Sequence, residues 1–253
     1  MVLRIYRRTA FFWAWISMVA ISCPSTAEEA IRLLYSERRP FYYLDPSGAV
    51  EGTLAEPTIR AFQKAGIPFE WQLMSANGIL NAIRESSYPA CSPGWYKSRE
   101  RELYANYTKP IYRDLPLVGL AHSEMQYEKG QTAKNLLERR DFKLLVKKNY
   151  LSGPYLDALI SKVPREQIVE SSDDISVFVR LIYMKRADIA FVTQEEVESY
   201  VGQAKLNIGD FKVIKFPDIT TGQDRHILCN HKVPRSVVDA LNKAITSTVR
   251  LVR

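Results

Sequence analysis

The sequence predicts an α/β protein made of two strand-and-helix layers, with one layer inserted into the other. Strand-like and helical segments alternate over residues 30–92, and the same alternation recurs over 142–201. Further strand-like segments at 115–122 and 212–216 carry the chain out of the first layer and back to it. Alternating strands and helices typically build a parallel sheet covered by helices, so each stretch predicts one such layer.

The first layer is expected to hold three strands and two helices. The strands cover 30–36, 68–74 and 88–92, and the helices cover 57–64 and 76–84. Asp45-Pro46-Ser47-Gly48 is a strong turn signal between the first strand and the first helix. Pro57 suits the first turn of that helix, and Ala65-Gly66 suits its end.

The second layer is expected to hold three strands and four helices. The strands cover 142–146, 167–170 and 187–192, and the helices cover 131–139, 154–162, 174–185 and 195–201. Ser172 is placed to cap the amphipathic helix at 174–185. A strand at 226–229 and a closing helix at 237–249, capped by Ser236, return to the first layer. The expected domains are lobe 1 at 28–117 plus 217–253, and lobe 2 at 118–216.

Residues 1–27 have the composition of a signal peptide. Arg4, Arg7 and Arg8 precede a hydrophobic run at 10–20, and small residues at 25–27 suit a cleavage site. The run is shorter than the roughly 20 residues that a membrane span needs. The expected product is therefore a soluble protein of the periplasm, and lipoprotein anchoring at Cys23 is the less favoured alternative.

Charge and cysteine content narrow the function classes. The whole chain has a net charge of +7, which falls to about +4 without 1–27, and its basic residues are scattered, so nucleic-acid binding is not indicated. Cys91 and Cys229 remain, and an even pair in an oxidising compartment suggests one disulfide, with two buried free thiols as the alternative. Strand geometry separates His226 from Cys229 and His231, so no metal is expected. No dinucleotide or phosphate-loop motif is present, so no cofactor is expected.

The segment 91–112 holds the residues best suited to bind a ligand. Pro93-Gly94 is expected to end a strand, and a glycine lets the backbone approach a ligand closely. Ser98 suits the N-cap of a short helix at 99–105. Arg101 brings a planar fork of donors that matches a carboxylate or phosphate, although a solvated surface arginine is the alternative.

These residues resemble a motif of the family 3 extracellular solute-binding proteins, which bind polar amino acids in the periplasm. Gly94, Ser98-x-x-Arg101 and Tyr107-Thr108-Lys109-Pro110-Ile111-Tyr112 resemble its Gly…Thr-x-x-Arg…Phe-Ser-x-Pro-Tyr segment. Pro40-Phe41, Asp45-x-x-Gly48 and Gly52 fill its earlier positions, so the resemblance covers most of 30–122. It implies a two-lobed, type 2 periplasmic-binding fold with a ligand cleft between the lobes. It also implies that Arg101 clamps a ligand carboxylate, while Gly94 and Tyr96 offer backbone groups.

The second lobe departs from the family pattern. Ser152-Gly153 stands where the family has a Gly-Thr-Thr turn that contacts the ligand, and Thr193 replaces the Asp that accepts the ligand ammonium. An ammonium without that carboxylate loses a hydrogen bond worth about 1.5–3 kcal/mol. Either Glu37 or Glu195 substitutes, or the ligand is not an ordinary α-amino acid. Arg38 falls where an aromatic residue often stacks over the ligand, and its added charge favours an acidic solute unless it is merely an exposed loop residue.

The resemblance implies a monomeric, periplasmic solute-binding protein that captures a small carboxylate-bearing solute, amino-acid-like or acidic. Uptake through a membrane permease of the ABC type is the expected role, and no reaction is expected. One alternative is an enzyme on the same fold, similar to dehydratases of cyclic carboxylic acids, with Glu37 or Glu195 as the acid. Another is a sensory solute-binding module. The family usually adds a helix after the closing one, and its lack is expected either to reduce stability or to mark a truncated and poorly functional copy.

Overall fold

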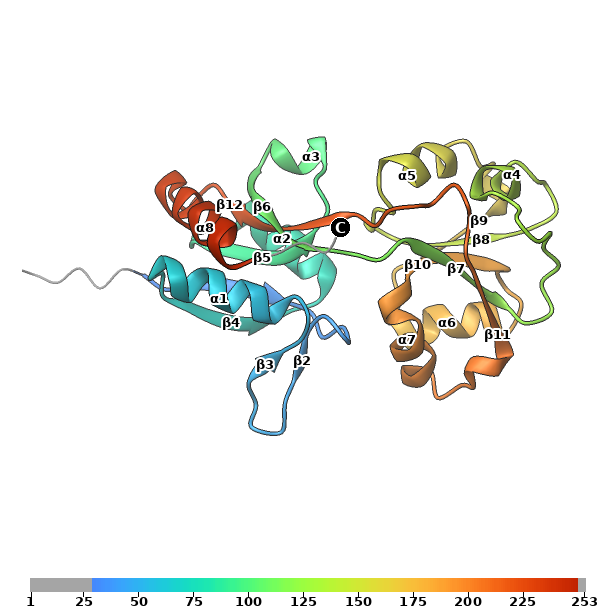
Figure 1. Ribbon diagram of the computed structural model, residues 1–253, viewed down its shortest axis with the longest axis horizontal. Coiled ribbons are helices and arrows are strands. Elements are labelled where there is room, and N and C mark those ends of the chain that lie inside the picture. Colours follow the sequence, from blue (N-terminus) through green and yellow to red (C-terminus); the bar gives the residue numbers. More distant parts are fainter. Residues whose placement is uncertain (1–28, 250–253) are drawn as a thin grey trace, which may run out of the picture.

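The computed structural model describes residues 29–249. The expected signal peptide at 1–27 and Cys23 lie outside this part of the chain. The described residues form two five-stranded sheets, each flanked by helices (Figure 1). No helix among them is both long and apolar enough to cross a membrane.

The first sheet combines strands from the two ends of the described chain. Its order is β4 (Phe69–Leu73), β1 (Ile31–Tyr35), β5 (Ala90–Trp95), β12 (Asp224–Asn230) and β6 (Ala105–Arg113). Its helices are α1 (Ala55–Ala65), α2 (Ala76–Glu85), α3 (Arg99–Glu102) and α8 (Arg235–Thr248), and a small hairpin joins β2 (Tyr43–Leu44) to β3 (Val50–Glu51). The strands β4, β1 and β5 are parallel, whereas β12 runs antiparallel to both of its neighbours.

The second sheet is built from one continuous stretch. Its order is β11 (Phe211–Ile214), β7 (Leu117–His122), β10 (Ile189–Thr193), β8 (Leu144–Lys147) and β9 (Ile168–Ser171). Its helices are α4 (Ala133–Leu137), α5 (Pro154–Ile160), α6 (Ile175–Tyr183) and α7 (Val197–Gln203), with short 3₁₀ turns at Arg165–Gln167, Gln194–Glu196 and Ile208–Asp210. β10, β8 and β9 are parallel, and β7 pairs antiparallel with β10 and β11.

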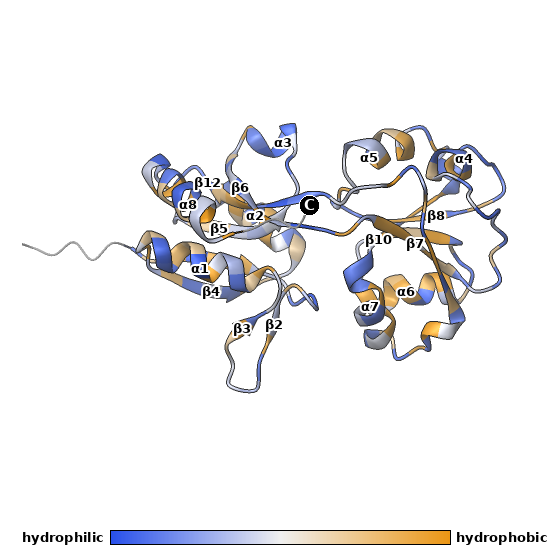
Figure 2. Ribbon diagram, viewed as in Figure 1, coloured by the Kyte–Doolittle hydropathy of each residue, from blue (hydrophilic) through white to orange (hydrophobic). Residues whose placement is uncertain are grey.

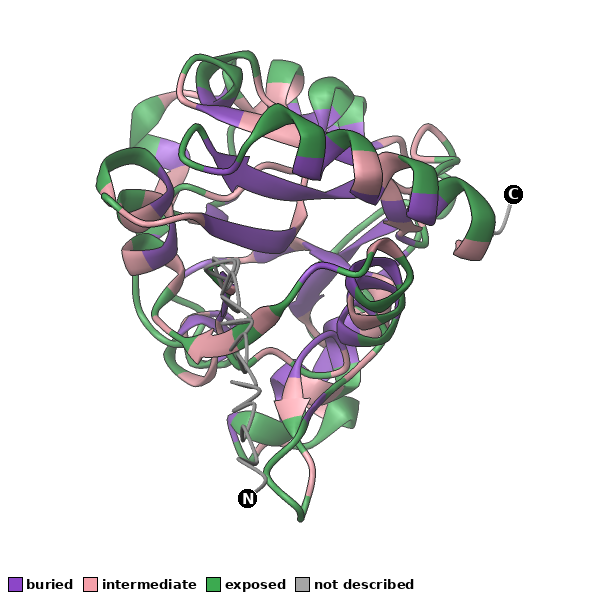
Figure 3. Cartoon of the chain, turned by 90° about the vertical axis from the view of Figure 1, so that its left-hand side faces the viewer, coloured by how far each residue is buried: buried purple, intermediate pink, exposed green. Residues whose placement is uncertain are grey.

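Both faces of each sheet are buried under helices, which explains the continuous apolar runs in the strands. Leu33 packs against the α1 and α8 side of its sheet, whereas its neighbour Leu34 packs against the α2 side. Leu120 and Ala121 divide between the two faces of the second sheet in the same way. The apolar and buried residues accordingly lie along the strands and the inner helix faces (Figures 2 and 3).

Several local expectations are corrected by the structure. β5 does not stop at Ser92 but continues through Pro93-Gly94 to Trp95, because β12 pairs with it there across an irregular register at His226 and Ile227. The helix expected at 99–105 ends at Glu102, and β6 then begins at Ala105.

The expected serine caps are also absent. Ser98 occupies the N-cap position of α3, but its side chain makes no capping hydrogen bond. Asp174, rather than Ser172, precedes α6, and α8 begins after Pro234, so Ser236 lies inside that helix. Proline fixes a φ angle compatible with a helix start, which moves this start ahead of the serine.

Two segments connect the sheets, at 114–116 between β6 and β7 and at 215–223 between β11 and β12. The amide of Asp114 donates to the carbonyl oxygen of Gln223 at 3.0 Å, so the segments are hydrogen-bonded to each other. A Cβ atom at Gly222 would lie 1.7 Å from the carbonyl oxygen of Asp114. The two segments therefore approach so closely that only glycine fits, and they run side by side between the lobes (Figure 1).

Gly222→Ala is expected to lower the free energy of unfolding by about 1–3 kcal/mol, because the added methyl group forces the backbone apart. Urea denaturation measures this change. Gly202→Ala is the matched control, since it lies inside α7 with no atom within 4 Å. This control is expected to raise stability by about 0.5–1 kcal/mol. A Gly222→Ala variant as stable as the wild type would contradict the close packing.

Candidate functional site

A cavity of about 310 Å³ lies between the two sheets. Its walls include the carboxyl ends of β1 and β5 from the first sheet and of β8 and β10 from the second. The segment 148–152, which follows β8, closes one side of it. Ligands in open α/β sheets bind at such carboxyl ends, and the volume suits a small molecule.

Arg101 faces this cavity from the short helix α3. Its residue exposure is 7%, and its guanidinium carbon lies 4.8 Å from the centre of the Trp95 ring. Nη2 donates to the carbonyl oxygen of Asn149, in the second lobe, at 2.9 Å. Within residues 29–249, no carboxylate forms an ion pair with it. Arg101 is therefore a buried cation that contacts the second lobe and still has N–H groups available for a ligand.

Arg38 and Glu196 form an ion pair across the cleft. Nε and Nη2 of Arg38 donate to Oε1 and Oε2 of Glu196, the second bond at 2.6 Å. Burial alone would lower the pKa of Arg38, but the adjacent Glu196 carboxylate helps raise it well above its usual range. Glu196 is fully buried and also accepts hydrogen bonds from the hydroxyls of Thr193 and Tyr200.

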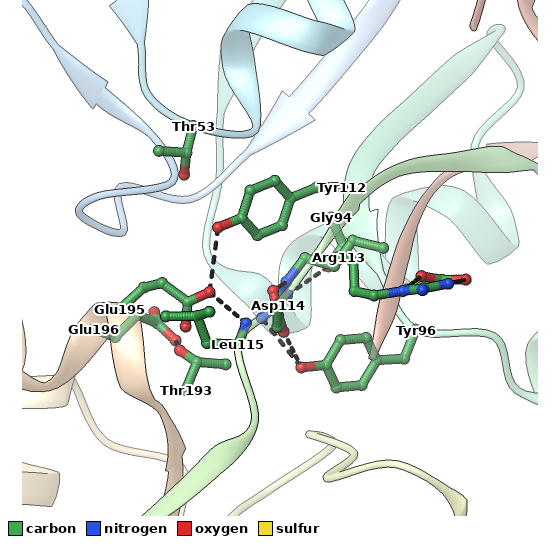
Figure 4. Close-up of polar contacts among 12 residues, drawn as sticks. Thr53, Gly94, Tyr96, Tyr112, Arg113, Asp114, Leu115, Thr193, Glu195 and Glu196 are labelled. Atoms are coloured by element: carbon green, nitrogen blue, oxygen red, sulfur yellow. Dashed lines mark hydrogen bonds and ion pairs between the residues drawn. The ribbon is translucent and has the colours of Figure 1, made fainter. Parts of the chain in front are cut away.

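A second buried ion pair supports the floor of the cavity. Nε of Arg225 lies 2.6 Å from Oδ1 of Asp114, which stands in the first connecting segment. Nη1 of Arg225 donates to the carbonyl oxygen of Gly94 at 2.8 Å, and the hydroxyl of Tyr96 donates to Asp114 (Figure 4). Burial opposes the charge of Arg225, but Tyr96 and Asp114 contribute to holding its pKa above the usual range. This network fixes Gly94 and Tyr96 beside the cavity.

Tyr42 lines the cavity, and its hydroxyl is buried. Its exposure is 5%, and the hydroxyl has no hydrogen-bond partner among the described residues. It lies over Gly94, where an added Cβ would be 2.9 Å from the hydroxyl oxygen. Burial raises the pKa of Tyr42 far above its usual value, against the opposing effect of Arg225 and Arg38. The group is therefore a neutral donor.

The structure places most of the predicted site residues in the cavity wall. Those that line it are Arg101, Gly94, Tyr96, Arg38, Ser152 and Thr193. Gly153 lies next to Ser152 and begins α5, with a φ of 95° and the Gln223 side chain against it. Ser98 is partly buried in front of α3 and does not line the cavity.

The two acids considered as substitutes for the family's Asp lie elsewhere. Glu37 is exposed and does not line the cavity. Glu195 is turned toward the first connecting segment, where Oε1 accepts from the Leu115 amide at 2.7 Å and from the Tyr112 hydroxyl at 3.2 Å (Figure 4). The buried acid of the cleft is instead Glu196, three residues after Thr193.

Sequence reasoning missed Glu196, Arg225 and Tyr42. The only available signal for Glu196 was its position beside Glu195, directly after the departure from the family pattern at Thr193. Arg225 belongs to no motif, and Tyr42 follows Pro40-Phe41 without being part of the motif. The cysteine pair expected as a disulfide is adjacent in the structure, with the Sγ atoms of Cys91 and Cys229 2.00 Å apart on β5 and β12.

No family model and no curated protein matches the sequence. Solved structures do match over most of the chain. An ancestral arginine-binding protein bound to arginine is 17% identical, with a TM-score of 0.65, over 86% of this chain and 91% of that one. The holo form of ArgBP from T. maritima is 15% identical, with a TM-score of 0.64, over 86% of this chain and 89% of that one.

Two further similar structures come from proteins with different roles. The substrate-binding protein of an amino acid ABC transporter is 15% identical, with a TM-score of 0.64, over 86% of this chain and 92% of that one. A histidine kinase sensor domain similar to periplasmic binding proteins is 14% identical, with a TM-score of 0.67, over 87% and 90%. Identities this low establish the architecture alone. The chain therefore has the two-lobed α/β fold of these structures, which is the fold expected from the sequence.

Proposed function

We propose that this protein binds a small, carboxylate-bearing solute in the cleft between its lobes, and that Arg101 pairs with the carboxylate. The observation that carries the proposal is the state of Arg101 itself. It is buried, it lines the cavity, and no acid among residues 29–249 forms an ion pair with it. Burying a charge without a counter-ion is unfavourable, so an anionic ligand at this position would stabilise the closed cleft.

The charges around the cavity support an acidic solute. Five basic residues line the wall, against three acidic ones: Arg38, Arg101, Lys147, Lys148 and Arg225, against Asp157, Glu170 and Glu196. Arg38 is paired with Glu196 and Arg225 with Asp114, and Lys148 and Glu170 are both exposed, which leaves Arg101 and Lys147 against Asp157. The field inside the cleft is therefore positive, which attracts anions and opposes cations.

Uptake through a membrane permease is the role we assign, with the protein acting as a monomer in the periplasm. The substrate-binding protein of an ABC transporter among the similar structures supports this role, and the adjacent cysteines suit an oxidising compartment. A sensory module is the second candidate, favoured by the similar histidine kinase sensor domain. No reaction is proposed, since Glu37 and Glu195, the acids considered for an enzyme, do not line the cavity.

Arg101→Met is expected to weaken binding of the identified solute by about 10- to 150-fold, the equivalent of one charge-assisted hydrogen-bonding group. A thermal-shift screen of carboxylates finds the solute, and calorimetry measures the affinity. Arg99→Met is the control, because Arg99 is exposed on the same helix and does not line the cavity. Unchanged affinity in the Arg101 variant, or equal losses in both variants, would refute the carboxylate clamp.

A further inference from the structure

We infer that the Arg38–Glu196 pair makes the cleft reject α-ammonium groups, so that it selects a carboxylic acid carrying an oxygen acceptor, bound by the Tyr42 hydroxyl, in place of the amine. The chemical class is that of 2-oxo and 2-hydroxy acids. The inference rests on the proposed function, since it takes the carboxylate of the same ligand to be held by Arg101.

All hydrogen-bond acceptor sites of the Glu196 carboxylate are already occupied. A carboxylate has about four acceptor sites. Glu196 uses four: two bonds come from Arg38, one from Thr193 and one from Tyr200. All of these donors belong to the protein, and the side chain is fully buried. An incoming ammonium would have to displace Arg38, which would leave that guanidinium buried without its counter-ion.

The other acids of the cavity are poorly suited to replace it. Glu170 is exposed and lies 3.8 Å from Arg165. Asp157 is half-buried, and its Oδ1 accepts the amide of Ser152 at 2.8 Å. Burial raises the pKa of Asp157, and the charge of Arg101 partly opposes this rise. Among the acids that line the cavity in residues 29–249, Asp157 is the remaining candidate acceptor for an ammonium.

The hydroxyl group of Tyr42 is a hydrogen-bond donor without a partner among the described residues. The Tyr42 hydroxyl is buried at the cavity wall without a partner among the described residues, which is uncommon for a buried polar group. Burial is the main cause of its raised pKa, which the charges of Arg225 and Arg38 oppose and the charge of Asp114 supports to a smaller extent. A neutral phenol with two cations nearby favours an oxygen acceptor and disfavours a cation. The cleft thus contains an unpaired donor, whereas an amino acid would need a further acceptor for its ammonium.

The test compares acids that differ only at the second carbon. The probes are pyruvate and alanine, 2-oxoglutarate and glutamate, 4-methyl-2-oxopentanoate and leucine, and phenylpyruvate and phenylalanine, titrated calorimetrically into the wild type. In the pair that binds best, the 2-oxo acid is expected to bind at least about tenfold more tightly than the amino acid, the equivalent of one charge-assisted hydrogen bond. An amino acid that binds as tightly as its 2-oxo partner overturns the inference and leaves the proposed function standing. If its binding is then lost in Asp157→Asn, Asp157 is the ammonium acceptor.

Two variants test the roles of Arg38 and Tyr42 in this preference. Arg38→Gln frees two acceptor sites of Glu196, so the preference is expected to move toward the amino acid by about tenfold or more. Arg39→Gln removes the same charge from an exposed neighbour and is expected to keep the wild-type ratio. Tyr42→Phe is expected to weaken the 2-oxo acid by about 2- to 12-fold without affecting the acid that has CH₂ at that carbon, such as glutarate.

The outcomes separate the two proposals. A ratio unchanged in Arg38→Gln, with the variant shown to be folded by its melting curve, refutes the role of the pair. If that variant does not fold, the wild-type ratio alone decides whether ammonium is rejected. If no carboxylate in a broader screen binds the wild type, the proposed function itself fails, and this inference fails with it.

Discussion

Arg225→Met is expected to lower the free energy of unfolding by about 3–5 kcal/mol, because it leaves Asp114 as an uncompensated buried charge. The side chains of Arg225 and Asp114 are 4% and 0% exposed, so water cannot replace the lost partner. The change also removes the donor to the Gly94 carbonyl oxygen. Asp114 lies in one connecting segment and Arg225 directly follows the other. The substitution therefore removes an ion pair at the junction of the lobes.

Urea denaturation followed by fluorescence measures this effect. Arg113→Met is the matched control, because Arg113 pairs with Asp224 at the same junction but both side chains are about one-third exposed. Exposed pairs contribute little, so this control is expected to leave stability unchanged. Replacing both partners, Arg225→Met with Asp114→Leu, is expected to recover much of the loss. Equal effects at Arg225 and Arg113 would contradict the difference in burial.

Replacing both Cys91 and Cys229 with alanine is expected to lower the free energy of unfolding by about 2–5 kcal/mol. The two residues are fully buried and 138 positions apart, so a bond between them closes a long loop in the unfolded chain. In the chain-entropy description, such a loop gains most from the cross-link.

The measurement uses residues 28–253 with and without a thiol reductant. The reductant is expected to shift the wild-type unfolding midpoint and to leave the double variant unaffected. Intact-mass analysis after alkylation counts the free thiols. Two free thiols in the folded wild type, or identical midpoints for the two proteins, would refute the bridge.

Much of the fold could be predicted from the sequence, because each sheet is buried on both faces and its strands are continuous apolar runs. Leu33 and Leu34 show this pattern, since both are fully buried on opposite faces of β1. Predictions failed where distant chain segments decide the outcome. β5 extends beyond Ser92 only because β12 lies beside it. Each layer that the alternation predicted to be parallel also contains an antiparallel strand next to a lobe crossing, β12 in the first sheet and β7 in the second.

The site was predictable only in part, for a similar reason. Arg101 is in a local motif whose spacing can be read along the chain, and it lines the cavity. Its role as a carboxylate clamp stays a prediction. The Arg38–Glu196 contact joins residues 158 positions apart, and the Arg225–Asp114 contact joins residues 111 apart. No periodicity or spacing encodes such pairs. The sequence pattern indicated Glu195 and not Glu196, because only the fold shows which of these two neighbouring carboxylates lies in the cavity wall.

The position of β12 constrains the order in which the protein can be assembled. This strand lies between β5 and β6, yet it is made after every strand of the other sheet. A chain that emerges from its N-terminus can complete the sheet of 117–214 first, while β6 still lacks the neighbour that joins it to β5. Pairing between such distant segments is slow and exposes strand edges in the meantime. The sheet of the first lobe therefore stays incomplete until residues 224–230 have been synthesised.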